Sequence, residues 1–126
     1  MIYSQFSPPT FLKNAHIQSI MNSVGPRKFR AKRITKSLNS EQLIISTEAG
    51  VRLTAELDKS NVSHPATKTK PLVILIHGWE GSSQSAYQVT TASYLLRSGF
   101  DVLRLNLRDH GDSHHLNREL FNSTLL

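Results

Sequence analysis

Two glycine-containing loops carry the residues of this 126-residue chain that could do chemistry. The first runs from His77 through Gly78 and Gly81 to Ser85, directly after the apolar run 72–76. Backbone N–H groups of such a glycine turn, at the carboxyl end of a strand, can bind an anion or the oxyanion of a reaction intermediate. The pattern also fits an ordinary tight connection between a strand and a helix, and this stretch alone favours neither interpretation.

The second loop has the sequence RDHGDS, residues 108–113, and follows another strand-like run. With His114 and His115 it brings three imidazoles into one short segment, the first being His110. These histidines lack the helical HExxH spacing of a zinc site, so the sequence predicts no metal here. They are interpreted as polar loop residues beside a cleft.

The elements around these loops predict a mixed sheet. Runs 43–47 and 51–57 are expected to form an antiparallel hairpin, the second alternating between apolar and polar residues. The continuous run 72–76 indicates a strand covered on both faces. A helix from Ala86 to a left-handed Gly99 and a strand 101–107 would complete a parallel βαβ unit, which places both loops on one rim.

The segment before the hairpin contains a short predicted helix. Asn14 can cap it, apolar residues recur on one face from Ile17 to Val24, and Gly25-Pro26 is expected to end it. That apolar face needs a partner. Basic residues then dominate 27–36 and supply most of the formal net charge of +6, so this tract is either a solvated connector or a site for phosphates or anionic lipid.

Composition narrows the class of protein. Hydrophobic residues make up 38% and charged residues 19%, typical of one globular unit. The chain has no cysteine, which excludes disulfides, a thiolate nucleophile and a thiolate metal site. No apolar run approaches the roughly 20 residues of a membrane-spanning helix, and no signal peptide is recognised, so a cytoplasmic location is expected.

Taken in order, the hairpin, the strand ending in HGxxG, the helix and the strand ending in RDHGDS resemble the N-terminal part of the α/β-hydrolase fold. The segment SPPTFLKNAHIQSI is similar to the PPxxLxNxHxQT pattern of the YheT-like esterase branch. The resemblance implies an α/β fold in which 1–126 is the N-terminal part of one hydrolase domain. Within it, 1–42 would be an N-terminal segment with a short helix and 43–126 the start of the sheet, which ends before the nucleophile elbow.

The same resemblance implies a site. The backbone N–H of Trp79 would be one oxyanion-hole donor, in a turn made with His77, Gly78 and Gly81. The family's GxSxG elbow, and the acid and histidine that follow it, have no counterpart in this sequence. We therefore assign no catalytic residue, no cofactor and no metal, and expect the serines near the two loops to be cap or loop residues.

Three functions remain open at this stage. The first is a front part of a serine carboxylesterase or lipase-like enzyme, inactive alone, whose substrate would be a small acyl ester and for which no nucleic acid partner is expected. The second is a binding module that uses the basic tract 27–36 on nucleic acid or an anionic membrane. The third is a non-catalytic remnant.

Overall fold

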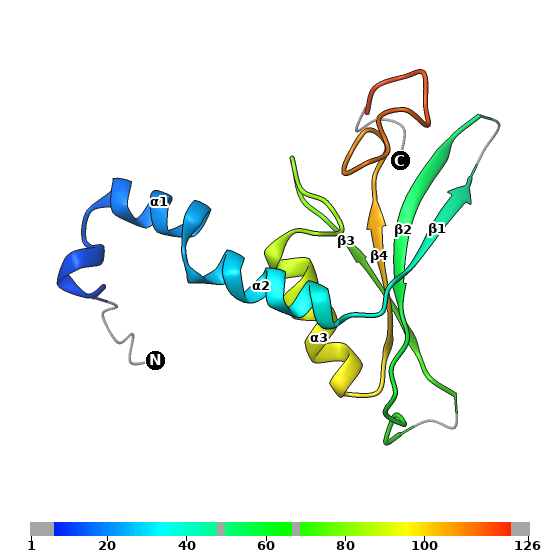
Figure 1. Ribbon diagram of the computed structural model, residues 1–126, viewed down its shortest axis with the longest axis horizontal. Helices are drawn as coiled ribbons and strands as arrows, with labels where there is room; N and C mark the ends of the chain where they lie inside the picture. The colour runs from blue at the N-terminus through cyan, green and yellow to red at the C-terminus, as the bar shows by residue number, and fades with distance from the viewer. Residues whose placement is uncertain (1–6, 48–49, 67–68, 122–126) are drawn as a thin grey trace, which may run out of the picture.

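The computed structural model describes residues 7–47, 50–66 and 69–121, and Figure 1 shows how their helices and strands are arranged. In chain order the elements are a 3-10 turn (Thr10–Leu12), α1 (Ala15–Val24), α2 (Pro26–Ser37), β1 (Glu41–Ser46), β2 (Arg52–Asp58), β3 (Leu72–Ile76), α3 (Ala86–Arg97) and β4 (Asp101–Asn106). No described helix is long and apolar enough to cross a membrane.

The strands form one four-stranded sheet in the order β1-β2-β4-β3. β1 and β2 make the expected antiparallel hairpin, with Leu43 opposite Ala55; residues 48–49 of its turn lie outside the described residues. β2 pairs with β4 antiparallel, and β3 pairs with β4 parallel. The predicted fold class, a mixed α/β fold with an antiparallel hairpin and a parallel βαβ unit, is therefore confirmed. This arrangement is consistent with a partial α/β-hydrolase fold.

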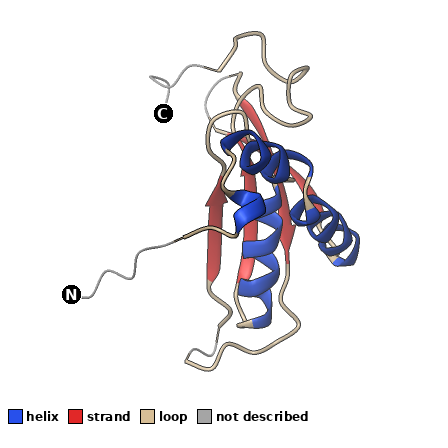
Figure 2. Cartoon of the chain, turned by 90° about the vertical axis from the view of Figure 1, so that its left-hand side faces the viewer, coloured by secondary structure: helices blue, strands red, loops and turns tan. Residues whose placement is uncertain are grey.

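The described helices lie on one side of the sheet (Figure 2). α3 packs on β4, and α2 packs on α3. α1 projects away from the sheet (Figure 1), and its apolar residues Ile17, Ile20 and Met21 are exposed. Asn14 caps α1 as predicted, because its side chain accepts hydrogen bonds from the N–H groups of the first turn. These three residues of the apolar stripe, which was expected to need a partner, are thus left exposed by the part of the chain that the structure describes.

The two faces of the sheet differ. On the helix side, β4 buries Val102, Arg104 and Asn106. On the other side, Ile74 and Ile76 of β3 are 55% and 59% exposed. The prediction that β3 is covered on both faces is therefore wrong for the described chain, because only α3 and its neighbours cover the sheet and they lie on one side.

The basic tract forms a helix, which overturns one of its two interpretations, the solvated connector. Gly25-Pro26 ends α1 as predicted, but Pro26 is also the first residue of α2, where its fixed φ and missing N–H suit the first helical position. Residues 27–36 are therefore helical, and not a connector. Farther along, Gly99 has φ +86° and ends α3 as predicted. Residues 117–121 form bends and irregular backbone.

β3 generates a prediction about association. It is an edge strand of the sheet, and its unpaired backbone groups lie beside the exposed apolar side chains of Leu72, Ile74 and Ile76. We expect a polypeptide of these 126 residues to self-associate through this edge, and Ile74→Lys to reduce the association at least severalfold. Sedimentation velocity would measure it, with Ile44→Lys on the opposite edge strand β1 as the matched control. Equal relief by both variants would contradict the assignment of the contact to β3.

Candidate functional site

His77 joins the two loops at the rim of the sheet. Its Nε2 accepts the N–H of Leu107 at 3.1 Å, so Nε2 carries no proton and the neutral ring holds its proton on Nδ1. That Nδ1 donates to the Gly78 carbonyl at 2.8 Å. The ring is 5% exposed and its centroid lies 4.7 Å from that of His110. The loops after β3 and β4 therefore share one rim, as predicted, and His77 is a buried connector between them.

The turn after β3 is closed by a hydrogen bond from Gly81 N–H to the Gly78 carbonyl, 2.9 Å long. Glu80, the third residue of that turn, has φ +53°, a left-handed conformation that normally favours glycine. Holding a residue other than glycine in this backbone conformation costs roughly 1 kcal/mol or more of folding free energy. Glu80 thus holds a strained backbone conformation directly after Trp79, the candidate donor.

The two glycines of the turn have different requirements. A Cβ at Gly81 would lie 2.9 Å from the Gly78 carbonyl oxygen and 3.0 Å from Cβ of His77, so only glycine fits without a shift of the backbone. A Cβ at Gly78 would meet nothing nearer than the Tyr87 hydroxyl, 3.9 Å away. The close approach of neighbouring backbone and side-chain atoms thus explains why position 81 is glycine. Position 78, in contrast, has room for a side chain.

Trp79, the proposed donor, lies between these residues. Among the described residues its backbone N–H donates no hydrogen bond. Trp79 is 83% exposed, so its side chain is not packed in the part of the chain that the structure describes. An unpaired N–H at the open rim of a sheet is available to a ligand oxygen.

Tyr87 connects the turn to α3. Its hydroxyl oxygen accepts the Gly78 N–H at 2.7 Å, and the same oxygen would lie 3.1 Å from a Cβ at Gly81. Tyr87 belongs to the first turn of the helix, which begins after Ser85. The Tyr87 hydroxyl therefore fixes the position of the turn relative to the start of α3.

A buried guanidinium lies beneath the second half of the loop. Arg104 of β4 has no exposed side-chain surface and forms ion pairs with two carboxylates of β2, Glu56 at 2.7 Å and Asp58 at 2.8 Å. Its Nη1 also donates to the Ser83 carbonyl at 2.8 Å, and its Nη2 donates to the Ser40 hydroxyl at 2.9 Å. One side chain thus joins β2, β4, the segment before β1 and the loop after β3.

The neighbouring polar groups complete this network. Ser83 donates its hydroxyl to Glu56 at 3.0 Å and its N–H to the side-chain oxygen of Asn106 at 2.6 Å. The Asn106 amide in turn donates to Thr54. Gln84 donates its side-chain amide to the same Glu56 carboxylate. Residues 83–84 are therefore held from below by side chains of β2 and β4.

The serines near the loops do not form a nucleophile. Ser83 and Ser113 are buried, and their hydroxyls donate to Glu56 and to the His110 carbonyl. Ser82 and Ser85 accept backbone N–H groups within the loop, although Ser85 makes no side-chain cap of α3. Within the described residues no serine hydroxyl bonds to a histidine ring, which agrees with their interpretation as loop residues.

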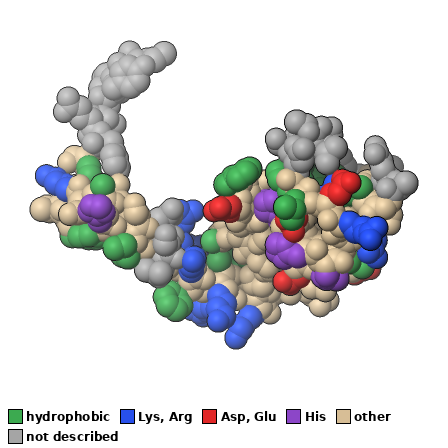
Figure 3. Space-filling view, turned by 90° about the horizontal axis from the view of Figure 1, so that it is seen from above, with side chains coloured by type: hydrophobic (Ala, Val, Ile, Leu, Met, Phe, Trp, Pro, Cys, Tyr) green, Lys and Arg blue, Asp and Glu red, His purple; other side chains and the backbone are tan. Residues whose placement is uncertain are grey.

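The histidines of the second loop take separate positions. His110 donates from its ring to the Arg108 carbonyl at 2.8 Å, and His114 forms an exposed pair with Asp109 at 2.6 Å. Figure 3 shows histidine side chains over the rim and Lys and Arg side chains along the region of α2. The described residues contain no group of three or more side chains placed to hold a metal ion.

Comparison with known proteins adds one finding. A family model described as alpha/beta hydrolase fold matches residues 71–124. That match covers β3, the glycine turn, α3, β4 and the second loop, which are the elements that build the rim. No curated protein and no solved structure matches the chain. The α/β-hydrolase fold is thus supported for the segment that holds the candidate donor.

The buried network generates a stability prediction. Arg104→Met leaves Glu56 and Asp58 buried without their cation, and breaking such a pair typically costs about 3–5 kcal/mol. We expect a loss of that size in the free energy of unfolding. Urea unfolding followed by circular dichroism, in an Ile74→Lys background that limits association, would measure it. Arg97→Met, on the exposed end of α3, is the control and should change stability by less than about 0.5 kcal/mol.

Tyr87 generates a second prediction. Tyr87→Phe keeps the ring and removes the acceptor of the Gly78 N–H, so the Gly78 amide should exchange with deuterium at least several times faster. Tyr94→Phe changes an exposed tyrosine two turns later on α3 and should leave that amide unchanged. Nuclear magnetic resonance or mass spectrometry can follow the exchange. Unaltered protection in the Tyr87 variant would show that the phenol does not hold the turn.

Proposed function

We propose that residues 71–113 are the oxyanion-turn portion of a serine carboxylesterase of the α/β-hydrolase family, within the YheT-like branch, acting on small acyl esters through an acyl-enzyme. The observation that carries the proposal is the unpaired N–H of Trp79, at the carboxyl end of a strand in a segment that matches the hydrolase fold. In that fold the loop between this strand and the next helix supplies one oxyanion donor.

An oxyanion donor acts mainly in the transition state. The carbonyl oxygen of an ester gains negative charge as the tetrahedral intermediate forms, and a fixed N–H stabilises that charge more than it stabilises the ground state. His77, Gly81 and Tyr87 hold the turn so that the donor does not have to be reoriented. The rest of the reaction needs an activated serine and a base, and the 126 residues contain no GxSxG elbow.

The test removes the donor itself. Trp79→Pro deletes the backbone N–H at a turn position where proline is favoured, whereas Trp79→Ala removes only the side chain. In a polypeptide that carries these residues together with a GxSxG elbow, we expect the proline variant to lose about 10²–10³-fold in kcat with little change in KM. The alanine variant should keep kcat within a few-fold.

Two further results bear on this proposal. The 126-residue chain alone should neither hydrolyse short acyl esters nor be labelled by a serine-directed fluorophosphonate, because it holds a donor without a nucleophile. Stoichiometric labelling of any of its serines would show that a nucleophile was overlooked. Equal kcat values for the proline and alanine variants would remove Trp79 from the mechanism.

A further inference from the structure

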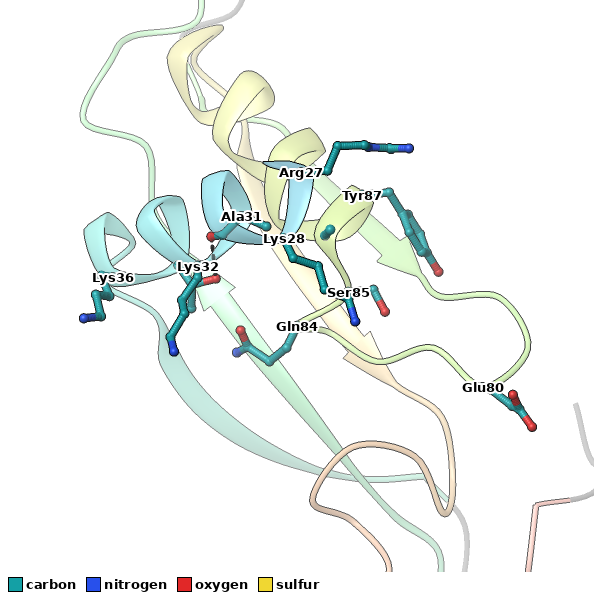
Figure 4. A pocket seen from close by; sticks show the side chains of 11 residues that line it. Arg27, Lys28, Ala31, Lys32, Lys36, Glu80, Gln84, Ser85 and Tyr87 are labelled. Atoms are coloured by element: carbon teal, nitrogen blue, oxygen red, sulfur yellow. Dashed lines mark hydrogen bonds between the residues drawn. The ribbon is translucent and has the colours of Figure 1, made fainter. Parts of the chain in front are cut away.

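A cleft separates α2 from the start of α3. It encloses about 900 Å³, and its walls come from opposite sides: Lys28, Lys32 and Lys36 from α2, and Gln84, Ser85 and Tyr87 from the loop and first turn of α3. Figure 4 shows Lys28 extending toward Ser85, with the Lys32 and Gln84 side chains projecting into the same space. This volume lies in the range of small-molecule sites, roughly 300–1,000 Å³.

The three lysines share one face of α2 because they are four residues apart. All three are exposed, and none forms an ion pair with a described residue. Like charges at this spacing repel each other along a helix. One carboxylate, Glu80, lines the cleft, and Figure 4 places it at the far end from the lysines. The lysine side of the cleft is therefore positively charged without a compensating group.

The opposite wall adds to this charge. Ser85 precedes α3 without a side-chain cap, and the first turn of the helix contains no acidic residue. Free N–H groups at the start of a helix carry partial positive charge and attract anions. Ser85, Ala86 and Tyr87 at the start of α3 line the same cleft as the α2 lysines, so the two features lie beside one volume.

We propose that this cleft binds the phosphate group of a small phosphate monoester. A dianionic phosphate offers acceptors to ammonium groups and to helix N–H groups together, which is the pairing that the two walls present. A nucleic acid is less suited, because Tyr87 is the one aromatic residue among those lining the cleft and no row of rings is available for stacking. The cleft shares Glu80 and Tyr87 with the Trp79 turn, whereas its lysines come from α2. Phosphate binding by these lysines does not depend on an esterase activity.

Binding can be tested on the 126-residue chain by equilibrium dialysis with radiolabelled glycerol 3-phosphate, which counts bound ligand in monomers and oligomers alike. The site variant is Lys28→Gln, Lys32→Gln, Lys36→Gln. The control, Lys13→Gln, Arg33→Gln, Arg118→Gln, removes the same charge from exposed positions outside the cleft. We expect saturable binding that weakens about tenfold or more in the site variant and less than about threefold in the control.

A second measurement needs no variant. Bound glycerol 3-phosphate should protect Lys28 and Lys32 of the unaltered chain from acylation by an amine reagent, compared with Lys13, as read by mass spectrometry. Absence of saturable binding, or equal weakening in both variants, would overturn the proposal. Binding of an RNA oligonucleotide or of phosphatidylserine vesicles that requires the cleft lysines, without binding of glycerol 3-phosphate, would also overturn it and assign the surface to a macromolecule or a membrane.

Discussion

The buried guanidinium of Arg104 is the interaction on which the rest of the structure depends. Glu56 and Asp58 lie on the helix-facing side of β2, where burying two carboxylates is costly in free energy unless a cation contacts them. Arg104, directly opposite Glu56 in the sheet register, supplies that cation and uses its remaining donors on Ser83 and Ser40. The sheet thus buries a polar layer under its helices, and that layer fixes both the strand pairing and the loop above it.

The candidate site is built on this layer. Residues 83–84 are held by β2 and β4, His77 ties the turn to the end of β4, and Tyr87 ties it to the start of α3. With the turn fixed at these points, the N–H of Trp79 stays unpaired at the rim. The opposite face of the sheet is apolar, and no described residues cover it. At the edge of the same sheet, β3 has backbone groups that can pair with another strand.

Much of this could be predicted from local patterns. The strand 72–76, the helix from Ala86 and the left-handed Gly99 follow from apolar runs and glycine positions, and the structure confirms them. The Arg104 network was missed, although its signal was present: Thr54, Glu56 and Asp58 alternate in β2, and Arg104 interrupts an apolar strand. Strand pairing decides whether such charges meet, and pairing is not local. α2 was missed because Pro26 was interpreted only as a stop, although proline also suits the first position of a helix.

We propose that the Trp79 N–H donates to the oxygen that becomes negative in ester hydrolysis. The most direct measurement is a crystal structure of a polypeptide that carries these residues and a serine nucleophile, after reaction with a phosphonate that mimics the tetrahedral intermediate. We expect the phosphonyl oxygen to lie about 2.7–3.1 Å from the Trp79 nitrogen, the distance expected of an oxyanion donor. A phosphonyl oxygen held by other donors, with the Trp79 N–H directed to solvent, would contradict it.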